Sequence, residues 1–144
     1  MVATWRNVML QHVRGAIDQP FLKASLAAHH AALQHTPAGY GVITLVESSA
    51  RIPGGDVRDE AGRLRVKTQH MLKAHAVLIG GEGFFASTMR AVITGILTVA
   101  QSRVPTKMVG SELDAAAFIV DRVCPIGTDA GELAETLMAF RSAQ

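Results

Sequence analysis

The chain has 144 residues, of which 49% are hydrophobic and 18% are charged, and its formal net charge is +2. This balance excludes an intrinsically disordered protein, which combines few hydrophobic residues with a high net charge. The single cysteine, Cys124, excludes an intramolecular disulfide framework and a zinc site built from cysteines. The length fits one domain that buries its own core.

No segment has the composition of a membrane span or of an export sequence. The longest apolar run, residues 91–100, is shorter than the roughly 20 residues that a membrane-spanning helix needs. The N-terminal segment MVATWRNVML lacks the basic stretch and the apolar stretch of a secretory signal. These features predict a cytoplasmic protein without a membrane span.

Strand and helix patterns alternate along the chain. In chain order, they predict elements at residues 2–5 (strand), 8–13 (strand), 18–36 (helix), 41–46 (strand), 56–71 (helix), 76–79 (strand), 84–101 (helix), 107–109 (strand), 111–120 (helix) and from 129 onward (helix). Asp18, Asp56 and Ser111 are expected to cap their helices, because their side-chain oxygens accept hydrogen bonds from free backbone N–H groups.

This alternation predicts an α/β fold. We expect a single sheet of about four to five mostly parallel strands with four to five helices, because parallel strands need crossover helices between them. The two segments at residues 2–5 and 8–13 predict a short N-terminal hairpin that turns at Arg6 and Asn7 and lies at the edge of the sheet.

The helix at residues 84–101 is apolar on nearly all sides. Such a helix is either central, or it covers a protein partner or an apolar ligand with its outer face. The expected partner-binding or ligand-binding residues are Met71, Phe84, Phe85, Met89, Val92 and Ile93. A pocket lined by Phe84, Phe85, Met89 and Met71 would favour a ligand carrier, whereas a flat apolar patch would favour protein docking.

Motifs for cofactors, metals and catalysis are weak. Residues 81–86 fit G-x-G-x-x-[G/A], but Glu82 would repel a phosphate, and this is not the first strand–helix unit. We interpret these glycines as a tight turn and expect no cofactor. The six histidines have no metal-ligand spacing, and there is no G-x-S-x-G motif. We therefore expect no metal site and no catalytic residues.

A nucleic-acid partner is not expected either. The net charge is small, and aromatic residues make up only 5% of the chain. A groove for single-stranded nucleic acid combines basic residues with aromatic stacking platforms. The basic residues near the second predicted helix are interpreted as a solvated face, with an acidic protein partner as the alternative.

Three stretches resemble a known family: NVMLQHVRGAID (7–18), GVITLVESSA (41–50) and AVLIGGEGFFASTMRAVITGIL (76–97). Together they resemble small standalone bacterial proteins of the sulphate-transporter and anti-sigma-antagonist (STAS) superfamily, which are similar to the sporulation anti-anti-sigma factor and overlap the lipid-binding CRAL-TRIO-like fold. The resemblance covers most of residues 5–122. It implies a STAS-like α/β domain at residues 1–123, with residues 124–144 as a helical extension packed on it.

Regulatory members of this family carry Asp-Ser-Ser-Gly, in which a partner kinase phosphorylates a serine at the start of the following helix. The matching residues here are Glu47–Ala50, so the resemblance implies Ser49, or else Ser48, as the phosphorylation site. Glu replaces Asp, Ala replaces Gly, and the predicted helix starts several residues later. The alternative is that both serines satisfy backbone groups of the loop.

Two functions remain open. The first is a non-enzymatic regulatory or protein-interaction module of the anti-sigma-antagonist type, which binds a protein partner or a second copy of itself as a homodimer. The second is a carrier or sensor of an apolar, lipid-like small molecule bound beside the third helix. Fold resemblance alone gives no reason to expect an enzyme.

Overall fold

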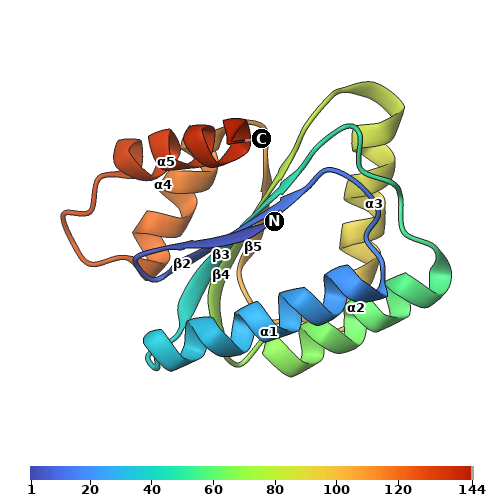
Figure 1. The fold of residues 1–144 in the computed structure, drawn as a ribbon, viewed down its shortest axis with the longest axis horizontal. Coiled ribbons are helices and arrows are strands. Elements are labelled where there is room, and N and C mark those ends of the chain that lie inside the picture. The colour runs from blue at the N-terminus through green and yellow to red at the C-terminus, as the bar shows by residue number, and fades with distance from the viewer. Residues whose placement is uncertain (144) are drawn as a thin grey trace.

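The computed structural model describes residues 1–143, which form one sheet with helices on both faces (Figure 1). The strands are β1 (Val2–Trp5), β2 (Val8–Val13), β3 (Tyr40–Val46), β4 (Leu72–Ile79) and β5 (Thr106–Val109). They lie side by side in chain order. β1 pairs antiparallel with β2, and all other neighbours pair in parallel. The predicted α/β fold with an N-terminal edge hairpin is confirmed.

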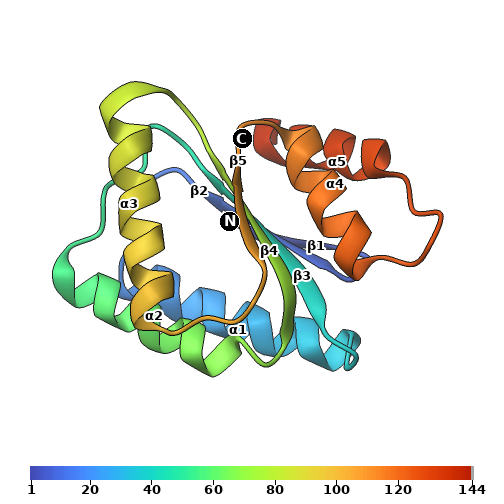
Figure 2. The same cartoon turned by 180° about the vertical axis from the view of Figure 1, so that it is seen from behind.

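The helices form two layers. They are α1 (Gln19–His35), α2 (Gly55–Thr68), α3 (Gly83–Val99), α4 (Glu112–Val123) and α5 (Ala130–Ser142). Helices α1–α3 cover one face of the sheet, and α4 and α5 cover the other, as the two opposite views show (Figures 1 and 2). The strand order advances in one direction, so right-handed crossovers place α1–α3 on the same side. No helix within residues 1–143 is long and apolar enough to cross a membrane.

Two of the three predicted helix caps are correct. The carboxylate of Asp18 accepts a hydrogen bond from the backbone N–H of Phe21 at 2.9 Å. The hydroxyl of Ser111 accepts one from the N–H of Asp114 at 3.1 Å. The prediction for Asp56 is wrong, because the cap of α2 is Gly54, two residues earlier, and the helix begins at Gly55. Asp56 lies in the first turn instead, where a negative charge is favourable near the helix dipole.

The α4–α5 face holds one continuous core. Helix α4 lies close to the sheet because it presents the small residues Ala115 and Ala116, and because Gly41 of β3 leaves room for Ile119. Leu133 and Leu137 of α5 belong to the same core. The C-terminal extension therefore packs on the same hydrophobic core as the sheet.

The α1–α3 face is built differently, because its core is divided into two clusters. One cluster lies toward the start of the parallel strands and consists of Met9, Ala32, Tyr40, Val42, Met71, Leu72 and Val104. The other lies toward their carboxyl ends and consists of Val13, Val46, Ala50, Val77, Ile79, Ala86 and Met89. The middle of this face is occupied by polar side chains.

Helix α3 is not a central helix. Only Ala86, Met89 and Val92 are buried, whereas Phe84 is 84% exposed and Val99 is 78% exposed. An outer-layer helix packs one stripe against its neighbours, so the rest of its apolar surface stays in contact with solvent. The apolar composition of residues 84–101 therefore does not correspond to burial.

The space around two glycines, Gly41 under α4 and Gly95 in α3, predicts opposite effects of alanine substitutions on stability. A Cβ atom at Gly41 would lie 3.0 Å from Ile119 Cγ2 and 3.1 Å from Val123 Cγ2, within a fully buried region. Gly41→Ala should lower the free energy of unfolding by about 1–3 kcal/mol through overpacking. Gly95→Ala, in α3 with open space at its Cβ position, should raise it by about 0.5–1 kcal/mol. Urea denaturation of both variants measures this, and equal stability of Gly41→Ala and the wild type would contradict the close packing.

Candidate functional site

A row of polar side chains crosses the middle of the α1–α3 face. Strands β2, β3, β4 and β5 each contribute one: Gln11, Thr44, His75 and Thr106. The strand register pairs Gln11 with Thr44 and His75 with Thr106, so each pair lies side by side. This polar row separates the two apolar clusters of that face.

Hydrogen bonds join the polar row to helices α1 and α2. The amide nitrogen of Gln11 donates to Ser25 Oγ of α1 at 2.8 Å, and the hydroxyl of Thr44 donates to the amide oxygen of Gln11 at 3.2 Å. Thr44 Oγ1 lies 2.9 Å from His75 Nε2, and His75 Nδ1 lies 3.2 Å from Arg65 Nη1 of α2. A continuous chain of polar contacts therefore runs from α1 across the sheet to α2.

The directions of these hydrogen bonds determine which ring nitrogen of His75 carries the proton. A guanidinium can only donate, so Nδ1 of His75 accepts from Arg65, and the ring proton is on Nε2. That proton is donated to Thr44, whose own hydroxyl proton goes to Gln11. Burial, followed by the nearby charges of Arg65 and His29, lowers the pKa of His75 to about 3. The imidazole is therefore neutral near pH 7.

Arg65 is a buried cation with only neutral partners. Its side chain donates to Ser102 Oγ and Thr106 Oγ1, both at 2.8 Å, and to His75. The residue is 7% exposed, and none of the ion pairs within residues 1–143 includes it. Burial lowers the pKa of Arg65 to about 10, so the group keeps its charge at neutral pH. A buried charge without a counter-charge is unfavourable.

A cavity of about 160 Å³ lies between the polar row and helices α1–α3. Its apolar lining includes Ile17, Phe21, Leu64, Ile93, Ile96 and Leu97. Thr44 and His75 retain accessible surface although they lie in the middle of β3 and β4, where their neighbours along each strand are buried, apart from Lys73 near the start of β4. The cavity accounts for that surface, because both residues line it.

His29 lines the cavity, and Tyr40 lies beside His29. The ring nitrogen Nδ1 of His29 lies 2.6 Å from the hydroxyl of Tyr40, which also lies 3.2 Å from the backbone oxygen of His29. Burial, followed by the charges of Arg65 and His30, lowers the pKa of His29 to about 4. Burial also raises the pKa of Tyr40. Both rings are therefore neutral near pH 7 and join α1 to β3.

A different group of charged residues lies at the carboxyl end of β3, on the other face. Arg141 of α5 donates to both carboxylate oxygens of Glu47, at 2.7 and 2.9 Å, and to Glu112 at 2.7 Å. Hydrogen bonding from Arg141 is the main reason why the pKa of Glu47 is lowered. His12 Nε2 lies 3.0 Å from the same carboxylate. This group attaches α5 to the end of the sheet.

The two candidate phosphorylation residues, Ser48 and Ser49, are exposed in the loop after β3. The hydroxyl of Ser49 donates to the backbone oxygen of Arg14 at 2.8 Å, as expected for a loop serine that satisfies the backbone. Helix α2 begins only at Gly55, so Ser49 is not at a helix N-terminus. Ser48 lies against Gly81, which has φ +78°.

The predicted ligand-binding set is not brought together. Of its six residues, only Ile93 lines the cavity. Met89 and Met71 belong to two separate core clusters, and Phe85 packs against the cluster that contains Met89. Phe84 points to solvent.

The sequence prediction missed the polar row and Arg65. The available indication was weak: Gln11 and Thr44 lie within predicted strands, but His75 and Thr106 lie just before the strands predicted at residues 76–79 and 107–109, because β4 and β5 begin earlier, at Leu72 and Thr106.

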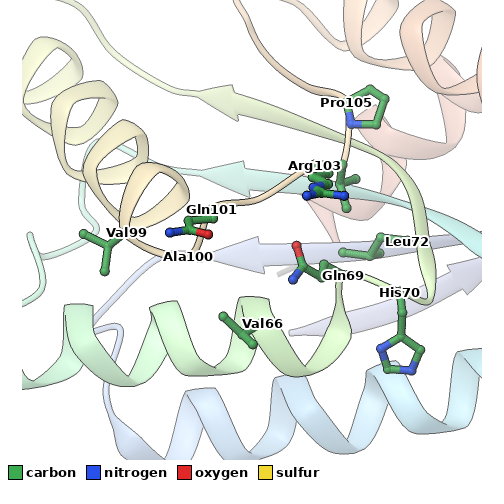
Figure 3. Close-up of a pocket in the computed structure, with 10 residues that line it drawn as sticks. Val66, Gln69, His70, Leu72, Val99, Ala100, Gln101, Arg103 and Pro105 are labelled. Carbon is green, nitrogen blue, oxygen red and sulfur yellow. The ribbon is translucent and has the colours of Figure 1, made fainter.

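A larger hollow of about 620 Å³ lies between the end of α2 and the loop that follows α3. Figure 3 shows Val66 and Val99 on the two helices and Arg103 and Pro105 on the loop. This hollow is an open groove, and no hydrogen-bonded network of its lining side chains occurs within residues 1–143. Polar groups converge on the smaller cavity instead. Over the same residues, no three His, Cys, Asp or Glu side chains are placed to hold a metal ion.

The neutral state of His75 predicts a specific dependence of stability on pH. The unfolded chain binds a proton at this histidine near pH 6.5, whereas the folded protein binds it only near pH 3. Above about pH 6.5 the histidine is neutral in both states, and the folded protein has its full stability. As the pH falls from 6.5 toward 3, protonation of the unfolded chain lowers the free energy of unfolding by up to about 1.4 kcal/mol per pH unit. Urea denaturation between pH 7 and 5 should therefore show a smaller slope for His75→Gln than for the wild type. Exposed His70→Gln is the control, and an equal slope in His75→Gln would contradict the assignment.

The chain was also compared with known proteins. No family model, no curated protein and no solved structure matches it. The function proposed below therefore follows from the cavity, the polar row and Arg65.

Proposed function

We propose that the protein is a non-enzymatic carrier or sensor of a small molecule with an apolar body, which binds in the cavity under helices α1–α3. The observation that carries this proposal is the cavity itself. It is lined by partly buried apolar side chains in the middle of a face whose two ends are well packed. Small-molecule sites are concave and mainly apolar hollows of this kind, and a protein has few of them.

The lining has the composition of a small-molecule site. Such sites combine a mainly apolar wall with a few polar groups that orient the ligand. Here the wall comes from three helices, and the polar groups come from the row of Gln11, Thr44 and His75 together with Arg65. A volume of about 160 Å³ is similar to the roughly 150 Å³ of an engineered cavity that holds benzene. It favours a compact molecule over a long acyl chain.

Two features of the loop after β3 argue against phosphorylation as the way in which the protein works. Glu47 stands where the regulatory family members carry Asp, and Arg141 of α5 holds both of its carboxylate oxygens. Ser49 lies outside the helix start at which an added phosphate would be stabilised. Membership of the STAS superfamily, a cytoplasmic location and phosphorylation of Ser49 or Ser48 stay predictions.

Native mass spectrometry of freshly purified protein tests the carrier function. The wild type should carry an adduct with the mass of a small molecule. Ala61→Phe should lose the adduct, because Ala61 lines the cavity and a phenyl ring would fill much of a volume that suits benzene. The same variant should keep or raise the melting temperature, since filling a cavity restores packing contacts.

Ala24→Phe is the matched control, because Ala24 lies on the exposed side of α1 in the same layer. It should retain the adduct of the wild type. Wild-type protein that is free of adducts in several independent preparations would contradict the carrier function, and so would an adduct that persists in Ala61→Phe.

The second candidate is protein docking through the exposed side of α3, with a second copy of the chain as the partner. The exposed Phe84 and Val99 favour it. Between them, the helix carries a single charged residue, Arg90. Two copies of a nearly uncharged face meet with little like-charge repulsion, so the face suits an isologous homodimer.

Size-exclusion chromatography with light scattering tests this candidate. A homodimer would have twice the monomer mass of 15.3 kDa at high micromolar concentration. The double variant Phe84→Ser, Val99→Ser should then shift the protein toward the monomer, whereas Met138→Ser, exposed on α5, should not. A monomeric wild type over the whole concentration range would contradict docking between copies.

A further inference from the structure

We propose that the ligand is a monoanionic carboxylate with a compact apolar body, whose carboxylate binds Arg65 while the body lies among the side chains of α1–α3. This inference rests on the proposed carrier function and adds the chemical class of the ligand. It follows from the charge, the free donors and the size of the cavity.

The first step is the charge of the site. Among residues 1–143, Arg65 is the only lysine or arginine that lines the cavity, and no aspartate or glutamate lines it. The polar partners of Arg65 are two hydroxyls and a neutral imidazole, which do not balance its charge. An anion that enters the cavity therefore meets one uncompensated positive charge and no opposing carboxylate. In a desolvated site this attraction is stronger than in water.

The second step is the set of free donors. A guanidinium has five N–H groups, and Arg65 uses Nε–H, one N–H of Nη1 and one N–H of Nη2. One N–H on each terminal nitrogen is left without an acceptor within residues 1–143. Both terminal nitrogens therefore keep a donor for an acidic ligand, and a carboxylate has the two acceptor oxygens and the negative charge that a guanidinium binds best.

The third step limits the ligand to a single negative charge. The two histidines that line the cavity, His29 and His75, are both neutral near pH 7, because burial lowers the pKa of His29 to about 4 and that of His75 to about 3. Arg65 alone therefore balances the ligand. A dianion such as a phosphate monoester would keep one uncompensated charge in the cavity, which is unfavourable.

His75 acts as a positioning residue in this arrangement. Its Nδ1 accepts from Nη1 of Arg65, and its Nε2–H is held by Thr44. The polar row thereby fixes the plane of the imidazole, and the imidazole restrains the guanidinium. A fixed guanidinium loses less conformational freedom when the carboxylate binds.

Benzoate and hexanoate are suitable probes, because each joins a carboxylate to an apolar body that suits a cavity of about 160 Å³. Their neutral counterparts are benzamide and hexanamide. Isothermal titration calorimetry on protein freed of adducts should show that each carboxylate binds about tenfold or more tightly than its amide, as expected for a charge-assisted hydrogen bond. Methyl spectra labelled at isoleucine should show shifts at Ile93 and Ile96 on binding.

Arg65→Met keeps an unbranched chain as long as the stem of arginine up to Nε, and it removes the guanidinium and its charge. It should abolish the preference for the carboxylates while the amides still bind. Arg63→Met is the control on the same helix, because Arg63 is exposed and pairs with Glu60. Circular dichroism establishes that each variant is folded. If Arg65→Met does not fold, the comparison of carboxylate with amide on the wild type decides the question alone.

The outcomes separate this inference from the proposed function. Amides that bind the wild type as tightly as the carboxylates would overturn the carboxylate inference and leave the carrier function standing. An unchanged preference in folded Arg65→Met would also overturn it. If neither carboxylates nor amides bind and the isoleucine methyl signals do not shift, the carboxylate inference fails, and the adduct measured by native mass spectrometry alone decides the carrier function.

Discussion

A guanidinium with no carboxylate partner among residues 1–143 lies under the middle of the sheet, and the α1–α3 face is organised around it. Arg65 donates to Ser102, Thr106 and the neutral ring of His75. Those neutral acceptors satisfy part of its hydrogen-bonding capacity but none of its charge. The polar row that supports Arg65 interrupts the apolar face, so the core on this side forms two clusters with a cavity between them.

The two faces of the sheet therefore have different roles. On the α4–α5 face, alanines and Gly41 allow close packing, and Arg141 attaches α5 to Glu47 at the end of β3. This side is stabilised by a continuous core and by hydrogen-bonded ion pairs. The other face combines a cavity with a partly satisfied cation, which lowers stability unless something is bound there. The continuous core lies on one face, and the proposed binding site lies between the two core clusters of the other.

Much of the fold could be predicted, because strand and helix patterns depend on neighbours in sequence. The alternation of apolar runs and helical stripes predicted the parallel pairing of most strands. Asp18 and Ser111 marked two helix starts correctly. The cap of α2 was predicted two residues too late, since Gly54 caps this helix without a side-chain hydrogen bond. The apolar composition of α3 suggested burial, but its position in the outer layer leaves Phe84 in solvent.

The candidate site could not be predicted in the same way. By itself, the sequence determined the α/β class, the edge hairpin and most element boundaries, because periodicity and capping are local properties. Only the tertiary structure decided that Gln11, Thr44, His75 and Thr106 form one row, since strand pairing joins residues that are far apart in the chain. The missing counter-charge of Arg65 is likewise a property of all its spatial neighbours. No local pattern contains that information, because it depends on how three helices are placed over the sheet.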